Sequence, residues 1–168
     1  MIQMIELGEN TSLTSDVMIY NALIKAQDTN KLLQQFKIEY PFEGALASNS
    51  NSIFVADVTN DLKKKTMNSS HYTALTQIFV KTKNADYKTV SQITRTALEV
   101  IEEVLENDES LGRFQPIFMK HSSDYGSKFA LKGRSVIVQT KEQRIKTNTD
   151  IEVDNVCEMI VKINGEDE

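Results

Sequence analysis

Residues 86–106 carry the strongest periodic pattern in the chain. Apolar side chains recur there at every third or fourth position and line one side of a helix. The stripe consists of Val90, Ile93, Ala97, Ile101 and Val104, widened by Leu98 and Leu105. This spacing predicts a long amphipathic α-helix with one buried face.

The glutamates of this segment fall on the side opposite the stripe, since each residue of a helix advances by about 100°. They are Glu99, Glu102, Glu103 and Glu106, and no basic residue lies between Glu99 and Glu109. Negative charge near the C-terminal end of a helix opposes the helix dipole. Two interpretations stay open: a solvated acidic face, or an acidic surface that contacts a basic partner.

Three segments between residues 36 and 83 have the pattern of strands. In "FKIEYPF" (36–42), apolar and polar residues alternate, and Pro41 should end the strand or place it at a sheet edge. The continuous apolar run in "SIFVADV" (52–58) predicts burial on both faces of the sheet. Residues 71–83 predict a long strand with apolar side chains on both faces.

Further elements flank these segments. A helix is expected over residues 14–28, capped by Thr14 or Ser15, and "NKLLQQ" either continues it or forms another turn. A hairpin is expected from "RFQPIFMKHS" and "KFALKGRSVIVQTK", with Gly133 as a candidate bulge. Strand-like runs follow in "DIEVDNVCEMIVKI" (150–163).

The element order is therefore helix, three strands, helix, hairpin and C-terminal extension. Two helices cannot cover both faces of so large a sheet. We expect an α+β fold: a mainly antiparallel sheet of about five or six strands with two main helices packed on one face. The other face is then partly exposed or covered by another copy.

Composition narrows the class of protein. The single cysteine, Cys157, excludes an intramolecular disulfide and a cysteine-based zinc cage, and favours a reducing compartment. The sequence shows neither a membrane span nor the pattern of a secretory signal. The net charge is −5, and residues 141–168 alone hold 4 basic and 8 acidic residues. The C-terminal segment is thus acidic, and nothing resembles the basic face of a duplex-binding module.

The two central strands are joined by "DLKKKTMNSSHY", which contains no Gly or Pro to close a tight turn. We expect an exposed connection at the tip of a long hairpin. Lys63, Lys64 and Lys65 form the only basic run in the chain. They are either simply solvated or directed at a phosphate backbone or at acidic groups of a partner.

Motifs of catalysis are missing: the sequence has no dinucleotide-binding, phosphate-loop, nucleophile-elbow or zinc-protease pattern. His71 and His121 could join Asp57 or Asp61 in a metal site, but their spacing gives this no specific support. Cys157 lies in an apolar run and is expected to be inert. We therefore expect no enzyme, no catalytic or metal-binding residue and no cofactor.

A family resemblance is carried by "TALTQIFVKTKNADYKTVSQITRTALEVIEEVL" and by the hairpin of "FMKHSSDYGSKFALKGRSVIVQTKE". The first has a strand, a polar turn and a long amphipathic helix. In this order, after an N-terminal helix and a strand ending near a proline, the elements resemble tail terminator and tail-completion proteins of long-tailed bacterial and archaeal viruses. These are also described as minor capsid proteins. The resemblance covers about residues 14–142.

The resemblance implies a structural virion protein of the tail and neck, assembled in the host cytoplasm. Such proteins form a hexameric ring on the last ring of the tail tube, stop tube growth and present a surface to the head connector. Long hairpins face neighbouring subunits or the lumen. Lys63–Lys65 would then contact DNA non-specifically or meet the Glu99–Glu106 face of the next subunit.

The implied organisation is an N-terminal extension (1–13), a ring-forming α+β domain (14–142) and an acidic C-terminal extension (143–168). Either extension could add as a strand to a neighbouring sheet edge. The alternatives are another neck protein, such as a stopper or connector, and a regulatory, ligand-binding α+β domain that dimerises through its open sheet face. An enzyme with an unrecognised site is the third class.

Overall fold

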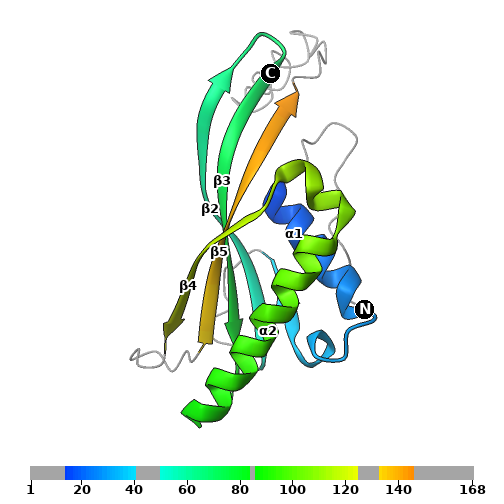
Figure 1. The fold of residues 1–168 in the computed structure, drawn as a ribbon, viewed down its shortest axis with the longest axis vertical. Helices are drawn as coiled ribbons and strands as arrows, with labels where there is room; N and C mark the ends of the chain where they lie inside the picture. Colours follow the sequence, from blue (N-terminus) through cyan, green and yellow to red (C-terminus); the bar gives the residue numbers. More distant parts are fainter. Residues whose placement is uncertain (1–13, 41–49, 84–85, 125–132, 146–168) are drawn as a thin grey trace, which may run out of the picture.

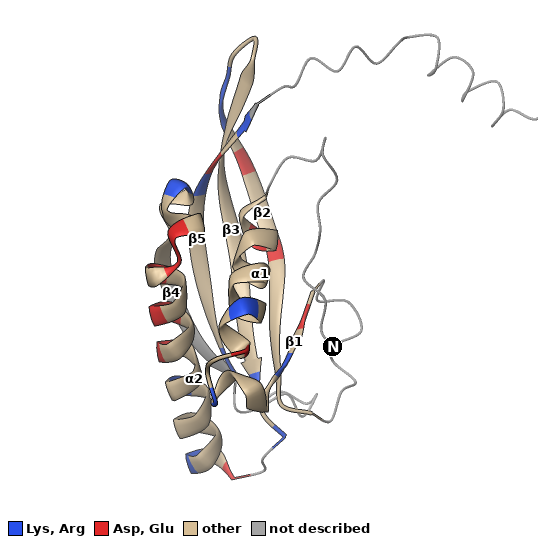
Figure 2. Cartoon of the chain, turned by 90° about the vertical axis from the view of Figure 1, so that its right-hand side faces the viewer, with Lys and Arg blue, Asp and Glu red and all other residues tan. Residues whose placement is uncertain are grey.

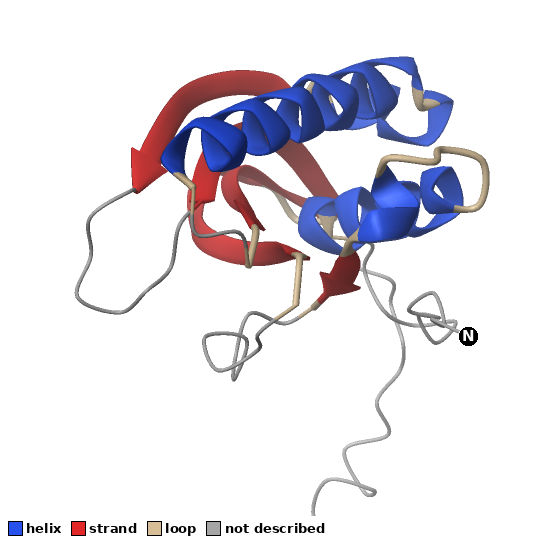
Figure 3. Ribbon diagram, turned by 90° about the horizontal axis from the view of Figure 1, so that it is seen from below, coloured by secondary structure: helices blue, strands red, loops and turns tan. Residues whose placement is uncertain are grey.

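The computed structural model describes residues 14–40, 50–83, 86–124 and 133–145. Two helices, α1 (Ser15–Gln27) and α2 (Tyr87–Asn107), lie side by side on one face of a single sheet (Figures 1 and 3). Short 3-10 helices, η1 (Leu33–Gln35) and η3 (Glu109–Phe114), follow α1 and α2.

The sheet has five strands in the order β1-β2-β3-β5-β4. Their bounds are β1 (Lys37–Glu39), β2 (Ser52–Lys65), β3 (Ser69–Lys81), β4 (Ile117–Asp124) and β5 (Gly133–Ile145). All neighbours are antiparallel except β1 and β2, which are parallel. The expected α+β fold, with a mainly antiparallel sheet and two helices on one face, is confirmed, and β1 lies at an edge as Pro41 suggested.

The core lies between the helices and the sheet. From the α2 stripe, Val90, Ala97 and Ile101 are fully buried, while Ile93 and Val104 are partly buried. Ala97 and Ile101, with Ile93 and Val104, pack with alternate residues of the central strands: Ile53, Val55, Ile78, Val80, Val136 and Val138. The α2 helix begins after Asp86, whose carboxylate caps it by accepting a hydrogen bond of 2.9 Å from the Thr89 amide.

The first part of β2 is buried on both faces, as its continuous apolar run predicted. Ile53 and Val55 face the helices as members of the core, and Phe54 between them is also fully buried. The Phe54 ring stacks on Phe79 of β3 with a centroid separation of 6.4 Å. Apolar packing therefore continues on the sheet face that carries no helix.

"NKLLQQ" takes the second of its two expected forms, because Leu33–Gln35 make the separate turn η1. The strand expected over residues 113–115 was wrong, since Arg113 and Phe114 belong to η3 and Gln115 follows it. Leu111 and Phe114 are three residues apart and both buried, so a 3-10 helix places both in the core. Gln115 then adopts a left-handed conformation (φ 47°, ψ 62°), and β4 begins only after Pro116.

The lysine-rich connection is strand rather than loop. β2 continues to Lys65, β3 begins at Ser69, and the turn between them is short. It is closed by the Thr66 amide, which donates to the Ser69 carbonyl (2.8 Å), and by the Ser69 amide, which donates to Thr66 Oγ1 (3.0 Å). The Thr66 hydroxyl thus closes a tight turn that contains neither Gly nor Pro.

Gly133 is not a bulge, because β5 pairs with β3 in unbroken register from this residue onward. The irregularity lies instead in β4, between Phe118 and Lys120. Gly133 is needed for close approach: a Cβ there would overlap the Val80 carbonyl oxygen and lie 2.6 Å from the Phe79 ring. The strand-like runs of residues 150–163, and Cys157 within them, lie outside the described residues.

We expect Gly133→Ala to lower the free energy of unfolding by about 1–3 kcal/mol, because the methyl group overpacks the junction of β3 and β5. Urea denaturation monitored by circular dichroism measures the change. Gly112→Ala is the matched control, since a Cβ at Gly112 meets no atom within 4 Å. Equal stability of the two variants would contradict the close approach at Gly133.

Candidate functional site

A three-stranded arm projects beyond the helices (Figures 1 and 2). We define it as residues 57–74 of the β2–β3 hairpin together with residues 140–145 of β5. Its boundary is set by β4, whose pairing with β5 ends at Gln139, and by the side chains of β2, which are exposed from Asp57 onward. The arm is therefore a continuation of the sheet beyond the hydrophobic core.

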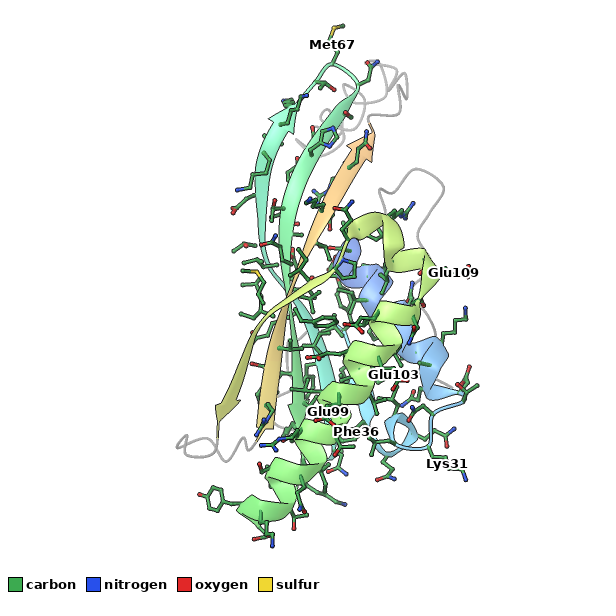
Figure 4. All side chains as sticks on the ribbon, viewed as in Figure 1. Lys31, Phe36, Met67, Glu99, Glu103 and Glu109 are labelled. Carbon is green, nitrogen blue, oxygen red and sulfur yellow. The ribbon has the colours of Figure 1, made fainter. Side chains whose placement is uncertain are left out.

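Several large apolar side chains of the arm are exposed to solvent. Val58 is 47% exposed, Leu62 51% and Met67, at the tip, 91% (Figure 4). Lone exposed apolar residues are common on proteins. Several of them on one projecting element favour a contact surface.

The three lysines lie in the last residues of β2, just before the turn, and all are exposed. Lys63 sits at an irregularity between Leu62 and Lys64, and its ammonium group lies 3.8 Å from the Asp61 carboxylate. Exposed ion pairs of this kind contribute little to stability. The lysines are therefore available to a partner.

The predicted acidic face lies on α2, away from the arm (Figures 2 and 4). Glu99, Glu103 and Glu106 are exposed, and Glu102 is half-buried. The ion pairs recorded among the described residues do not join this face to Lys63–Lys65. One copy of the chain thus presents a basic tip and an acidic helix as separate surfaces.

A buried carboxylate fixes the base of the arm to the body. Glu142 of β5 is 3% exposed and accepts hydrogen bonds from the Ser15 amide (2.7 Å) and the Ser15 hydroxyl (2.6 Å). Thr140 donates to the same hydroxyl at 2.6 Å. The expected cap by Thr14 or Ser15 is thus replaced: Thr14 makes no capping hydrogen bond, and the cap comes from a residue 127 positions away.

Arg144 links the strands of the arm to one another. Its guanidinium donates to Glu142 at 2.8 Å within β5 and to Asn60 of β2 at 3.3 Å. It also lies 4.3 Å from the centre of the Tyr72 ring on β3, a cation–π contact. Glu142 and Arg144 therefore connect α1 with each strand of the arm, which no local sequence pattern could reveal.

Replacing Glu142 with alanine should lower the free energy of unfolding by about 3 kcal/mol, because the Ser15 amide and the Arg144 charge lose their shared partner. Chemical denaturation measures the loss. Glu142→Gln is the control, since its amide oxygen can still accept from Ser15, and it should lose less. An alanine variant as stable as the parent would show that this contact does not hold the arm.

A second group of polar side chains lies next to this junction. The Tyr40 hydroxyl donates to the Asp16 carboxylate at 2.6 Å, and Asn60 donates to Asp57 at 2.5 Å. Although Asp57 as a whole is exposed, partial burial of its carboxyl group raises its pKa. The negative charges of Asp16 and Glu142 raise it further, and Asn60 and Arg144 oppose the shift.

This shift predicts a pH-dependent effect of Asp57→Asn. Since the pKa of Asp57 is raised in the folded state, the folded chain binds more protons than the unfolded chain between the two pKa values. Its charge therefore destabilises the fold above about pH 4, increasingly as pH rises through the folded pKa. Asp57→Asn should raise the melting temperature at pH 7, and the gain should shrink as pH falls towards 4.

Thermal melts across this pH range measure the difference. Asp61→Asn, on the same strand beside Lys63, is the control and should give no such gain. A gain from Asp57→Asn that is constant with pH, or that grows in acid, would contradict the raised pKa.

A basic hollow of about 330 Å³ lies beside the arm. Its lining combines Lys63, His71 and Lys141 from the arm with Arg113 from η3. The one carboxylate in this lining, Glu142, is already paired with Ser15 and Arg144. The charge of the hollow suits an anionic group rather than a metal cation.

Across the described ranges, no group of three or more His, Cys, Asp and Glu residues could hold a metal ion. The His71 ring lies near Ser69, with Nε2 3.4 Å from the hydroxyl. The side chain of His121 and the whole of Cys157 lie outside the described residues.

None of the helices in the described residues is both long enough and apolar enough to cross a membrane. A scan against protein-family models and a search of curated proteins found no match to the chain. The function must therefore be inferred from the arm, the acidic face and the order of elements.

Proposed function

We propose that the protein is a structural virion component that forms a ring at the head-proximal end of a viral tail tube. It ends growth of the tube and joins the tail to the head connector. Its proposed partners are a tail tube protein and a connector or stopper protein. The projecting arm is the observation that carries this proposal. An extension that projects beyond the core and carries charged and exposed apolar side chains is suited to contact another molecule.

The order of elements supports the same proposal. A helix, an edge strand, a long hairpin, a second helix and a final hairpin form the pattern that led to the resemblance. The work of such a protein is assembly, so it requires no catalytic residue and no cofactor. The proposed location is accordingly the neck of the virion, after assembly in the host cytoplasm.

Separate basic and acidic surfaces suit a closed ring, for which we propose six copies. Ring closure requires a heterologous contact, in which one surface meets a different surface of the next copy. The arm, with Lys63–Lys65, and the acidic α2 face, with Glu99, Glu103 and Glu106, are two such surfaces. We assign the arm of each copy to the acidic face of its neighbour.

A second candidate remains: a dimeric regulatory domain that pairs through the open face of its sheet. Ile117 and Met119 of β4 are large apolar residues exposed in the single chain, and they favour a covered sheet. Solution mass distinguishes the candidates, because six copies support the ring and two copies support the regulatory domain.

Changing Lys63, Lys64 and Lys65 together to glutamate should weaken assembly at low salt. Each exposed pair contributes about 0.2–1 kcal/mol. Losing three pairs, about 0.6–3 kcal/mol in all, should weaken the subunit contact by roughly 3-fold to 150-fold. The difference should fade at high salt, which screens these charges. Sedimentation velocity at a series of protein and salt concentrations measures the effect.

The matched control changes Lys31, Lys83 and Lys88 to glutamate, because these lysines are exposed, lie outside the arm and give the same net charge. It should assemble like the parent chain. Changing Glu99, Glu103 and Glu106 to lysine in the arm variant should restore assembly. Assembly that is unaffected by the arm variant would overturn the proposed contact.

A further inference from the structure

The arm has an open strand edge. β1 pairs only with Ser52–Phe54 of β2, and among the described strands none pairs with the outer edge of β2 from Val55 to Lys65 (Figure 2). Strand edges present backbone N–H and C=O groups that can bind another strand. This edge is therefore a surface to which a further strand could be added.

The character of the edge restricts its partner. Lys63–Lys65 and the two irregularities of β2, at Asp57/Thr59 and at Leu62/Lys64, are features that discourage pairing between identical edges. Antiparallel pairing of two β2 edges near their tips would bring like charges together. A strand with acidic residues removes this repulsion, and one with apolar residues can cover Val58 and Leu62.

The C-terminal extension contains a segment with both properties. "DIEVDNVCEMIVKI", residues 150–163, begins with alternating acidic and apolar residues and continues with an apolar run. Residues 146–168 carry 2 basic and 7 acidic residues, a net charge of 2 − 7 = −5. The sequence of this segment thus complements the lysines and the exposed apolar residues of β2.

The position of Ile145 places this segment within reach of the edge. Ile145 pairs with Ser69 beside the hairpin turn, so the chain continues from the tip of the arm. A strand beside β2 would lie three strand spacings, about 14–15 Å, from β5. The backbone from Ile145 to Asp150 can extend to about 17 Å, which suffices. A strand running antiparallel to β2 from there would place its first acidic residues near Lys65 and Lys63.

We propose that residues 150–163, of the same or a neighbouring copy, add an antiparallel strand to the open edge of β2. Backbone hydrogen bonds supply the pairing, and the acidic residues select the edge that carries the lysines. The strand covers Val58 and Leu62. This pairing is independent of the proposed ring, because it can form within one copy as well as between copies.

Disulfide trapping in the full chain tests the proposal. Because Cys157 is the only cysteine, the background Cys157→Ser, Val153→Cys leaves a single thiol, opposite the middle of the edge. In this background, a second cysteine is introduced at one β2 position at a time: Thr59, Asn60, Asp61 or Leu62. These four residues pair in regular register with Leu75, Ala74, Thr73 and Tyr72, so their side chains alternate between faces.

Under mild oxidation, a paired strand should link Val153→Cys mainly to the one residue opposite it, with weaker linking two positions along and none at the positions between, whose side chains lie on the other face. A monomeric linked product indicates pairing within one copy, and a linked dimer indicates exchange between copies; both support the proposal. Lys141→Cys and Gln143→Cys, which lie on β5, are controls and should stay unlinked. No link in β2, equal linking at all four positions, or preferential linking at β5 would overturn the proposal.

Discussion

The hydrogen bonds between Glu142 and Ser15 join the arm to helix α1, and the rest of the structure depends on this junction. The carboxylate comes from β5 where this strand leaves the core, and the amide comes from the first residue of α1. A buried carboxylate is stable only when it is fully paired, and here it is satisfied by the Ser15 amide and hydroxyl and by Arg144. The same contact caps α1 and anchors the arm, so neither can shift without the other.

This arrangement lets a three-stranded sheet continue where no helix covers it. From Asp57 onward the side chains of β2 are exposed, so burial of apolar surface does not fix the position of the arm. The arm is held instead by the backbone pairing of β2 and β5 with β3. The contacts of Arg144 with Asn60 and Tyr72 add to this pairing. The arm is therefore held from its base and across its strands, which leaves its outer surfaces available.

The parts that the sequence could predict are those encoded by local patterns. The α2 stripe, the buried run at Ile53–Val55 and the capping Asp86 each follow from residues within a few positions of one another. The Glu142 cap could not be predicted, because its partners are 127 residues apart and neither stands in a motif. The full length of β2 was also missed, since the exposed residues Asp61–Lys65 show no alternation between a buried and a solvated face.

The distribution of charge restricts how copies of the chain can contact each other in the proposed assembly. Two arms meeting tip to tip would oppose Lys63–Lys65 with themselves, and two α2 faces would oppose their glutamates. Both symmetric contacts are disfavoured, whereas a contact of arm with acidic face is favoured. Because such a contact is heterologous, each copy leaves one free surface of each kind until the chain of contacts closes. The rigid base at Glu142 then matters for assembly, because the direction of the arm sets the rotation between copies and so decides between a closed ring and an open filament.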